Sequence, residues 1–170
     1  MSKVRLHIDS DFNPKQNETY IGLINIDRPP FHLVTVSNLQ QFSWEVGKTR
    51  IGESVNSLIR HLNKSQTSCL FLRVSEEDST QRLVEKAYKN SGEAETCIGP
   101  INDFLQQLAK TNTASPLTVF ELMDFLKLNS LWKGTQCLNL NSEEINLEVY
   151  NRDSVNKHVE GLKNLELQRS

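Results

Sequence analysis

The sequence has few of the features that mark a disulfide-stapled or membrane-spanning protein. Its three cysteines, Cys69, Cys97 and Cys137, are odd in number and far apart, so they predict neither a disulfide framework nor a zinc site. No segment of the sequence approaches the roughly 20 consecutive apolar residues that span a bilayer, and its first residues lack the apolar core of a secretory signal. We therefore expect a soluble cytoplasmic protein without a membrane partner.

An excess of positive charge is also missing. The formal net charge is −2, from 19 Lys and Arg against 21 Asp and Glu, and the basic residues are scattered along the chain. Nucleic-acid affinity comes mostly from a basic face that neutralises phosphates, so we expect no nucleic-acid partner. Clusters of Leu, Ile, Val and Phe nevertheless indicate a folded chain rather than a disordered one.

The periodicity of the apolar residues predicts a sheet-rich front and a helix-rich back. Strands are expected near residues 4–8, 20–26, 31–36, 41–46 and 68–74, where residues alternate or form a short apolar run. Helices are expected around residues 55–62, 83–88, 97–108, 119–126 and 155–162, where apolar residues follow helical spacing. The predicted fold is α+β, an antiparallel sheet of about five strands with helices packed on one side. Residues 1–170 form one domain, with 141–170 as a peripheral C-terminal helix or tail.

Cys97 and His32 are the residues best suited to chemistry. Cys97 stands at a predicted helix start, where unpaired N–H groups and the helix dipole lower the pKa of a thiol and so favour the nucleophilic thiolate. His32 begins a predicted strand and is a candidate general base. Each also has a structural alternative, in which the cysteine fills space beside Ile101 and the histidine caps a loop or faces solvent.

The order of the two residues, with His32 on a predicted strand before Cys97 at a predicted helix start, resembles that of a known protein family. The segments concerned are Phe31-His32-Leu33-Val34-Thr35-Val36 and Thr96-Cys97-Ile98-Gly99-Pro100-Ile101-Asn102-Asp103-Phe104-Leu105. Over at most residues 20–110, the chain resembles the circularly permuted branch of the papain-like NlpC/P60 superfamily, in which a strand carrying His precedes a helix that opens with Cys.

The resemblance implies a cysteine-dependent hydrolase or acyltransferase that acts on a small amide or ester without a cofactor. Cys97 would then be the nucleophile and His32 the base, and Ser43 or Gln41 would orient the imidazole. The chain departs from the family pattern in having Thr96 before the cysteine and no His or carboxylate at the orienting position. A catalytically inactive relative would share these departures.

A rival hypothesis rests on residues 117–128, which are apolar except for Glu121, Asp124 and Lys127. A helix apolar over so much of its circumference is either deeply buried or docked to a partner. The alternative function is therefore a non-catalytic protein-interaction domain or a small subunit of a larger assembly, with a homo-oligomer formed through residues 117–128.

The first residues of the sequence also contain a candidate metal-binding spacing. His7, Asp9 and Asp11 alternate, so on a strand their side chains would share one face. No second cluster in the sequence completes a coordination shell. We therefore expect no metal.

Overall fold

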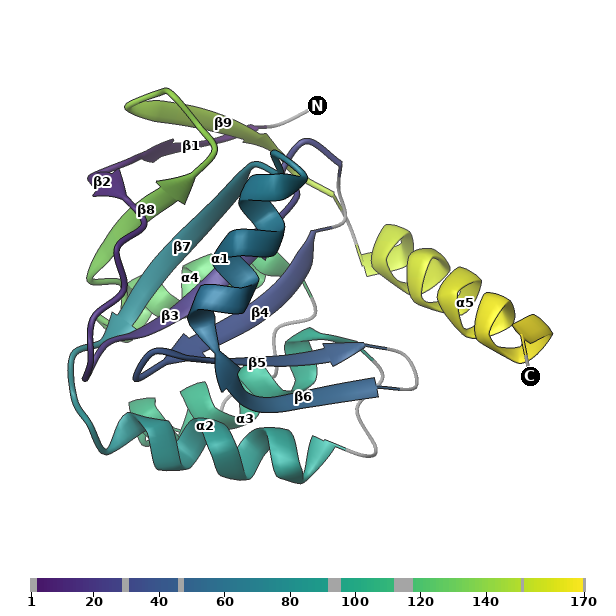
Figure 1. The fold of residues 1–170 in the computed structure, drawn as a ribbon, viewed down its shortest axis with the longest axis horizontal. Coiled ribbons are helices and arrows are strands. Elements are labelled where there is room, and N and C mark those ends of the chain that lie inside the picture. Colours follow the sequence, from purple (N-terminus) through teal and green to yellow (C-terminus); the bar gives the residue numbers. More distant parts are fainter. Residues whose placement is uncertain are drawn as a thin grey trace.

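The computed structural model describes residues 3–28, 31–45, 48–91, 96–111, 118–150 and 152–169. Its centre is a seven-stranded sheet in the order β2-β8-β7-β3-β4-β5-β6 (Figure 1). The strands are β2 (Ser10–Asp11), β3 (Thr19–Ile24), β4 (His32–Ser37), β5 (Gln40–Glu45), β6 (Lys48–Ser54), β7 (Cys69–Ser75) and β8 (Gly134–Leu138). A separate two-stranded sheet pairs β1 (Lys3–His7) with β9 (Glu144–Glu148). The helices are α1 (Val55–Lys64), α2 (Thr80–Lys89), α3 (Ile98–Ala109), α4 (Val119–Leu128) and α5 (Arg152–Arg169).

The predicted α+β class is confirmed, whereas the predicted sheet differs in detail. Strands β3, β4, β5 and β6 form an antiparallel meander, and β7 pairs with the other side of β3. The sheet is mixed rather than purely antiparallel, because β2 runs parallel to β8. It is also wider than the predicted five strands, since β6 and β8 flank the expected centre.

Helices cover both faces of the sheet, so the predicted one-sided packing is wrong. Helix α1 packs on one face (Figure 1), where Val55 and Leu62 join a cluster with Val34, Val36 and Phe71 of the sheet. Helices α2, α3 and α4 pack on the opposite face with the larger apolar cluster of the sheet. The central strands are therefore buried on both sides.

The apolar side chains of α4 pack inside the protein core. Six of its residues are buried in the larger cluster: Val119, Phe120, Leu122, Met123, Phe125 and Leu126. Leu117, which belonged to the predicted docking face, lies outside the described residues. The buried interpretation of this helix therefore holds, and the predicted homo-oligomer through residues 117–128 loses the exposed face on which it rested.

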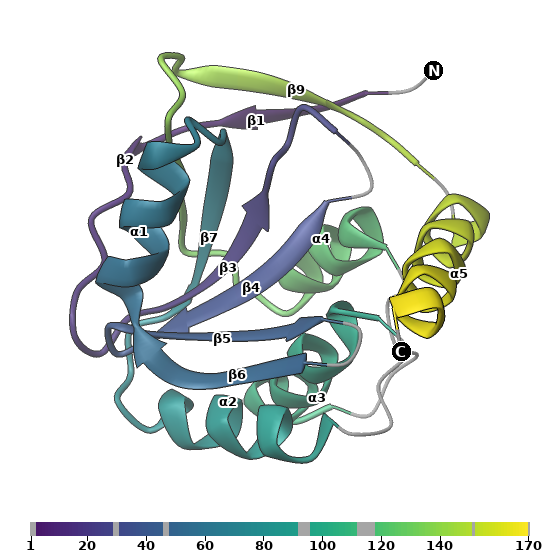
Figure 2. The ribbon, with the colours of Figure 1, turned by 45° about the vertical axis from the view of Figure 1, so that its right-hand side comes forward.

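Helix α5 lies apart from the sheet in two views (Figures 1 and 2). The chain that leads into it is anchored by Tyr150, whose ring makes edge contacts with Phe31 and Phe120 at centroid distances of 5.4 and 5.2 Å. The Tyr150 hydroxyl accepts a hydrogen bond from the Phe31 N–H at 3.4 Å. Among the described residues, no helix is long and apolar enough to cross a membrane.

A close contact at Gly22 holds the middle of the sheet on the α1 face. The Phe71 ring lies above this glycine and stacks on Phe12 with 3.6 Å between ring centroids. A Cβ at Gly22 would lie 2.7 Å from Phe71 Cε1 and 2.8 Å from Val34 Cγ2. Both neighbours are buried side chains, so neither has room to move away.

We expect Gly22→Ala to lower the free energy of unfolding by about 1–3 kcal/mol, because overpacking a closed core forces its neighbours out of position. The measurement is urea unfolding, in which the midpoint should fall while the slope of the unfolding free energy against urea concentration stays the same. Gly161→Ala is the matched control, since a Cβ there meets nothing within 4 Å and alanine favours a helix. Equal stability of the Gly22→Ala variant and the parent would show that the core is not closed over this glycine.

Candidate functional site

Strand β5 presents a row of polar side chains to the α1 face of the sheet. Gln41, Ser43 and Glu45 alternate with Phe42 and Trp44, and successive side chains of a strand point to opposite faces. Phe42 and Trp44 belong to the cluster under α2, α3 and α4, so the three polar residues face α1. Because β5 lies between β4 and β6, this row is inside the sheet, and Ser43 is only 3% exposed.

Helix α1 forms the opposite wall of a cleft above this row, through Ser57, Leu58 and His61. Gln41 ties the two walls together, because its Nε2 donates to the Ser54 carbonyl at 3.0 Å and to the Ser57 hydroxyl at 2.9 Å. Ser54 is also the N-cap of α1. The position of the helix over β5 is thus fixed by hydrogen bonds as well as by apolar packing.

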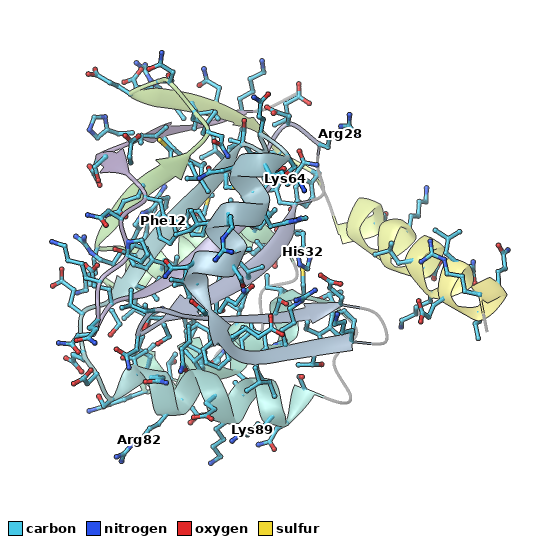
Figure 3. All side chains as sticks on the ribbon, in the orientation of Figure 1. Phe12, Arg28, His32, Lys64, Arg82 and Lys89 are labelled. Carbon is cyan, nitrogen blue, oxygen red and sulfur yellow. The ribbon has the colours of Figure 1, made fainter. Side chains whose placement is uncertain are left out.

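Charged side chains lie at the β5 and β6 side of the cleft. His32 Nε2 is 3.7 Å from Glu45 Oε1, and Figure 3 shows His32 at the end of β4 that lies toward α5. Arg50 of β6 stands opposite Ser43 in the strand register and pairs with Glu53 at 3.0 Å. The cleft therefore carries a carboxylate and a guanidinium on neighbouring strands.

The other side of the cleft is mainly apolar. Ile24 and Val34 come from β3 and β4, and Leu58 and Leu62 come from α1, with Asn25 and Thr67 as polar residues beside them. The cleft has a volume of about 560 Å³, which lies within the range of about 300–1,000 Å³ that is typical of sites for small organic molecules. The cleft is thus large enough for a ligand and has one polar and one mainly apolar side.

Two polar groups on the floor of the cleft are left without a partner from the chain. Within the described part of the chain, the Ser43 hydroxyl makes no hydrogen bond and no donor reaches Gln41 Oε1. Both side chains are at least nine-tenths buried. Among the described residues, Arg73 Nε is the only fully buried side-chain nitrogen or oxygen without a hydrogen-bond partner, so the Ser43 hydroxyl and Gln41 Oε1 still reach the solvent of the cleft. Both groups can therefore form hydrogen bonds with a molecule that enters the cleft.

Cys97 directly precedes α3, as predicted, and is half-buried there. It packs against the apolar cluster under α2, α3 and α4. Burial raises the pKa of the thiol, and backbone hydrogen bonds from Leu33 and from Cys97 itself oppose this only in part. Burial also raises the pKa of the hydroxyls of Tyr88 and Tyr150, and the nearby Cys97 adds to the rise for both. The raised pKa of Cys97 favours the neutral thiol over the nucleophilic thiolate.

The alternation of β4 separates the two predicted catalytic residues. Leu33 belongs to the cluster that Cys97 contacts, whereas Val34 belongs to the cluster under α1. His32 shares the face of Val34 and lines the cleft with it, so the strand backbone lies between the imidazole and the thiol. The structure brings His32 together with Ser43 and Gln41 in the cleft, and it places Cys97 on the opposite face.

Of the alternating residues at the start of the chain, His7 lies in β1, Asp11 lies in β2 and Asp9 lies between the two strands. His7 Nε2 lies 3.7 Å from Asp9 Oδ1, and Asp9 Oδ2 accepts the Thr135 N–H at 2.8 Å. Asp11 Oδ1 faces the Cys137 thiol at 3.7 Å. Within the ranges that the structure describes, no group of three or more His, Cys, Asp or Glu side chains is arranged to hold a metal ion.

Comparison with known proteins adds no relative, since no family model, no curated protein and no solved structure matches the chain. The resemblance to the permuted papain-like superfamily, and the catalytic roles that it implies, therefore stay predictions.

Sequence reasoning missed Arg50, Glu45 and His61 as members of a site. Arg50 lies in a stretch without the apolar alternation of a strand, and His61 has the spacing of an ordinary surface residue on α1. The sequence does contain one signal of the cleft floor, the alternation of the polar residues Gln41, Ser43 and Glu45. From the sequence alone, such a polar row indicates a strand face that is exposed to solvent.

We expect iodoacetamide to label Cys97 in the native protein at least about tenfold more slowly at pH 8 than an exposed cysteine introduced by Arg82→Cys. A raised pKa means that less thiolate is present at this pH, by a factor of about ten for each pH unit by which the pKa rises, and packing slows access further. Labelling should increase only as the pH exceeds the usual thiol value of about 8.5. The measurement is mass spectrometry of labelled peptides, with the protein in urea as the fully reactive control.

Fast labelling of native Cys97 near pH 7 would contradict this expectation. It would show an accessible thiolate and restore the main requirement of the cysteine-hydrolase hypothesis.

Proposed function

We propose that this protein is a small-molecule-binding domain whose ligand occupies the cleft between α1 and strands β3 to β6. The observation that carries the proposal is the polar floor on an internal strand, where Ser43 is 3% and Gln41 is 5% exposed. These two side chains bring a hydroxyl and an amide oxygen to the floor of the cleft, where both can bind a polar group of a ligand.

The proposal makes no use of Cys97. A cysteine nucleophile needs a thiolate that a base on the same side can generate, and the raised pKa of Cys97 and its position across β4 from His32 both weigh against that role. His32 and Ser43 instead serve as hydrogen-bonding groups of the cleft. The proposal thus gives His32 and Ser43 a binding role in place of the catalytic roles that the resemblance implied.

A thermal-unfolding screen of small polar metabolites tests the proposal. A ligand at 100 times its Kd stabilises the folded state by about 2.7 kcal/mol, which for a chain of this length raises the Tm by roughly 5–10 °C. We expect at least one compound class to give such a shift with the parent protein. The shift should be lost in His61→Trp, because the indole fills the cleft from an exposed position of α1.

Arg60→Trp is the matched control, since Arg60 is the exposed neighbour of His61 and does not line the cleft. It should keep the full shift. The proposal is wrong if no compound stabilises the parent, and equal shifts in both tryptophan variants would place the ligand elsewhere on the protein.

A second candidate function, a protein-interaction domain, is favoured by the exposed leucines of α5. Leu162 and Leu165 are 41% and 50% exposed, on a helix that lies apart from the sheet (Figures 1 and 2). A single helix of this length is marginal in water, and most helical stability comes from packing of an apolar face.

The spacing of the leucines favours a partner with an apolar groove over a coiled coil of two copies. In the sequence, Val155, Val159 and Leu162 follow the spacing of a coiled-coil seam, but Glu166 and Arg169 occupy the next two seam positions. Charges there would interrupt a coiled coil, whereas a groove needs only a short set of anchors at spacings of three and four residues.

Photo-crosslinking in the source cells tests this second function. A photoreactive residue at position 162 should join the chain to one discrete protein, whereas the same residue at position 164 should not. The two positions point to opposite faces, because two residues of an α-helix rotate by about 200°.

The purified partner should bind the double variant Leu162→Glu, Leu165→Glu at least about tenfold more weakly than the parent, which corresponds to about 1.4 kcal/mol of lost apolar burial. Asn164→Glu is the control and should bind as the parent does. Crosslinking that is equal from both positions, or that joins many proteins, would contradict a specific helix-in-groove interaction.

A further inference from the structure

The cleft has a defined order of chemistry across the strands. One row of the register runs from Val34 of β4 through Ser43 of β5 to Arg50 of β6. Reading along this row, the floor of the cleft changes from apolar through hydroxyl to cationic. A ligand that lies across the strands would therefore meet an apolar surface at one end and a guanidinium at the other.

On the face of β5 that lines the cleft, Glu45 is the next residue after Ser43. Glu45 is therefore a diagonal neighbour of Arg50, the residue opposite Ser43 on β6. The register supports this, because Ser43 stands opposite Arg50 and Glu45 stands opposite Lys48. Among the described ion pairs, Arg50 binds Glu53 and Glu45 faces His32 rather than Arg50. Opposite charges on diagonal neighbours are separated by about 7–8 Å at Cα, which leaves space for a small dipolar group between them.

The Arg50 guanidinium and the Glu45 carboxylate can each form further hydrogen bonds. A guanidinium has five N–H donors, and one nitrogen of Arg50 contacts Glu53 at 3.0 Å. The Glu45 carboxylate and the unpartnered Ser43 hydroxyl both accept hydrogen bonds and can share an ammonium group. Arg50 is thus placed to bind a carboxylate, and Glu45 with Ser43 is placed to bind an ammonium group.

The apolar side of the cleft is suited to an aliphatic side chain. Val34 lies next to Ser43 in the register, Ile24 lies next to His32, and Leu58 and Leu62 close this end from α1. Aliphatic residues of this size recognise an alkyl group by burying it, and each buried methylene strengthens binding roughly fourfold.

We propose that the ligand is a free α-amino acid with an aliphatic side chain, which rests on the proposed function of the cleft. Its carboxylate binds Arg50, its ammonium group binds Glu45 and Ser43, and its side chain packs against Val34, Leu58 and Leu62. The charges lining the cleft balance, so a ligand with no net charge enters without leaving an unpaired ion in a partly buried site.

Other ligand classes fit the cleft less well. A sugar or nucleobase ring usually stacks on an aromatic side chain, and none of the described residues that line the cleft is aromatic. A phosphate or a second carboxylate would need several cationic donors, whereas Glu45 repels an anion from the same floor.

Isothermal titration calorimetry with four compounds tests the assignment. L-leucine should bind, and 4-methylpentanoate, leucinamide and glycine should each bind about 10–100-fold more weakly, because each lacks one of the three recognised groups and leaves a charged or apolar surface unmatched. His61→Trp should abolish L-leucine binding, and Arg60→Trp should preserve it.

Charge variants connect each ligand group to one residue. Arg50→Gln should weaken L-leucine about 10–100-fold and leave leucinamide unchanged, since leucinamide has no carboxylate to lose. Glu45→Gln should weaken L-leucine by a similar factor and leave 4-methylpentanoate unchanged. Lys48→Gln is the control, because it removes a charge from the same strand as Arg50 at an exposed position outside the cleft.

The outcomes separate this inference from the proposed function. If another compound class stabilises the parent in a His61→Trp-sensitive way while L-leucine does not bind, the amino-acid assignment is overturned and the binding cleft stands. If no compound binds the parent, both are overturned. Loss of L-leucine binding to the same extent in Lys48→Gln as in Arg50→Gln would also overturn the assigned contacts.

Discussion

The structure depends on how the apolar side chains of the central strands are divided between two buried faces. Strands β3, β4 and β7 are covered by helices on both sides, so their apolar residues belong either to the cluster under α1 or to the larger cluster under α2, α3 and α4. Leu33 and Val34 are neighbours in sequence and lie in different clusters. A slip of one residue in the register would exchange the two faces, and Gly22 would no longer lie beneath Phe71.

This division explains why Cys97 and His32, the catalytic pair predicted from the sequence, do not form a site. Cys97 reaches β4 from the α3 side and contacts the backbone of Leu33, the residue directly after His32. The two predicted residues therefore come to the same end of the same strand, and the direction of their side chains separates them. Burial raises the pKa of a thiol and hydrogen bonds to the thiolate lower it. At Cys97 burial outweighs the two backbone hydrogen bonds.

Much of the fold is encoded in local patterns that sequence reasoning can detect. The stripe of Val55, Leu58 and Leu62 predicted α1, and the apolar run that begins at Ser68 predicted β7 (Cys69–Ser75). The edge strand β6 was missed because Lys48–Ser54 is mostly polar and exposed, so no apolar alternation marks it. The partners of β1 and β2 were also missed, since β9 and β8 lie more than a hundred residues away in the sequence and no local pattern specifies a pairing at that separation.

The candidate site was only partly predictable for a related reason. Sequence reasoning selected His32, Ser43 and Gln41 as polar residues on two strands that it had placed correctly, and these three do line one cleft. It could not decide which face of β4 the imidazole takes relative to Cys97, because that depends on which helices cover which face. It also could not distinguish a solvated polar row on β5 from one enclosed by a helix.

The coverage of the sheet by α1 shows why the cleft forms where it does. A helix of 10 residues is about 15 Å long, whereas a sheet of seven strands is about 29 Å wide at a spacing of about 4.8 Å. Helix α1 buries Val55 and Leu62 over the centre of the sheet and leaves Leu58 half-buried toward β5. The β5 floor lies at the margin of that cover, where apolar residues would be exposed to water and polar residues would be partly enclosed.

The hydrogen bonds of Gln41 turn this margin into a shaped cavity. Its amide nitrogen binds the N-cap carbonyl of α1 and the Ser57 hydroxyl, so the helix start is fixed to β5 without a ligand. A preformed wall spares a ligand the cost of ordering side chains on binding. Gln41 therefore has two roles. Its amide nitrogen holds α1 over the sheet, and its amide oxygen faces the cleft together with the Ser43 hydroxyl.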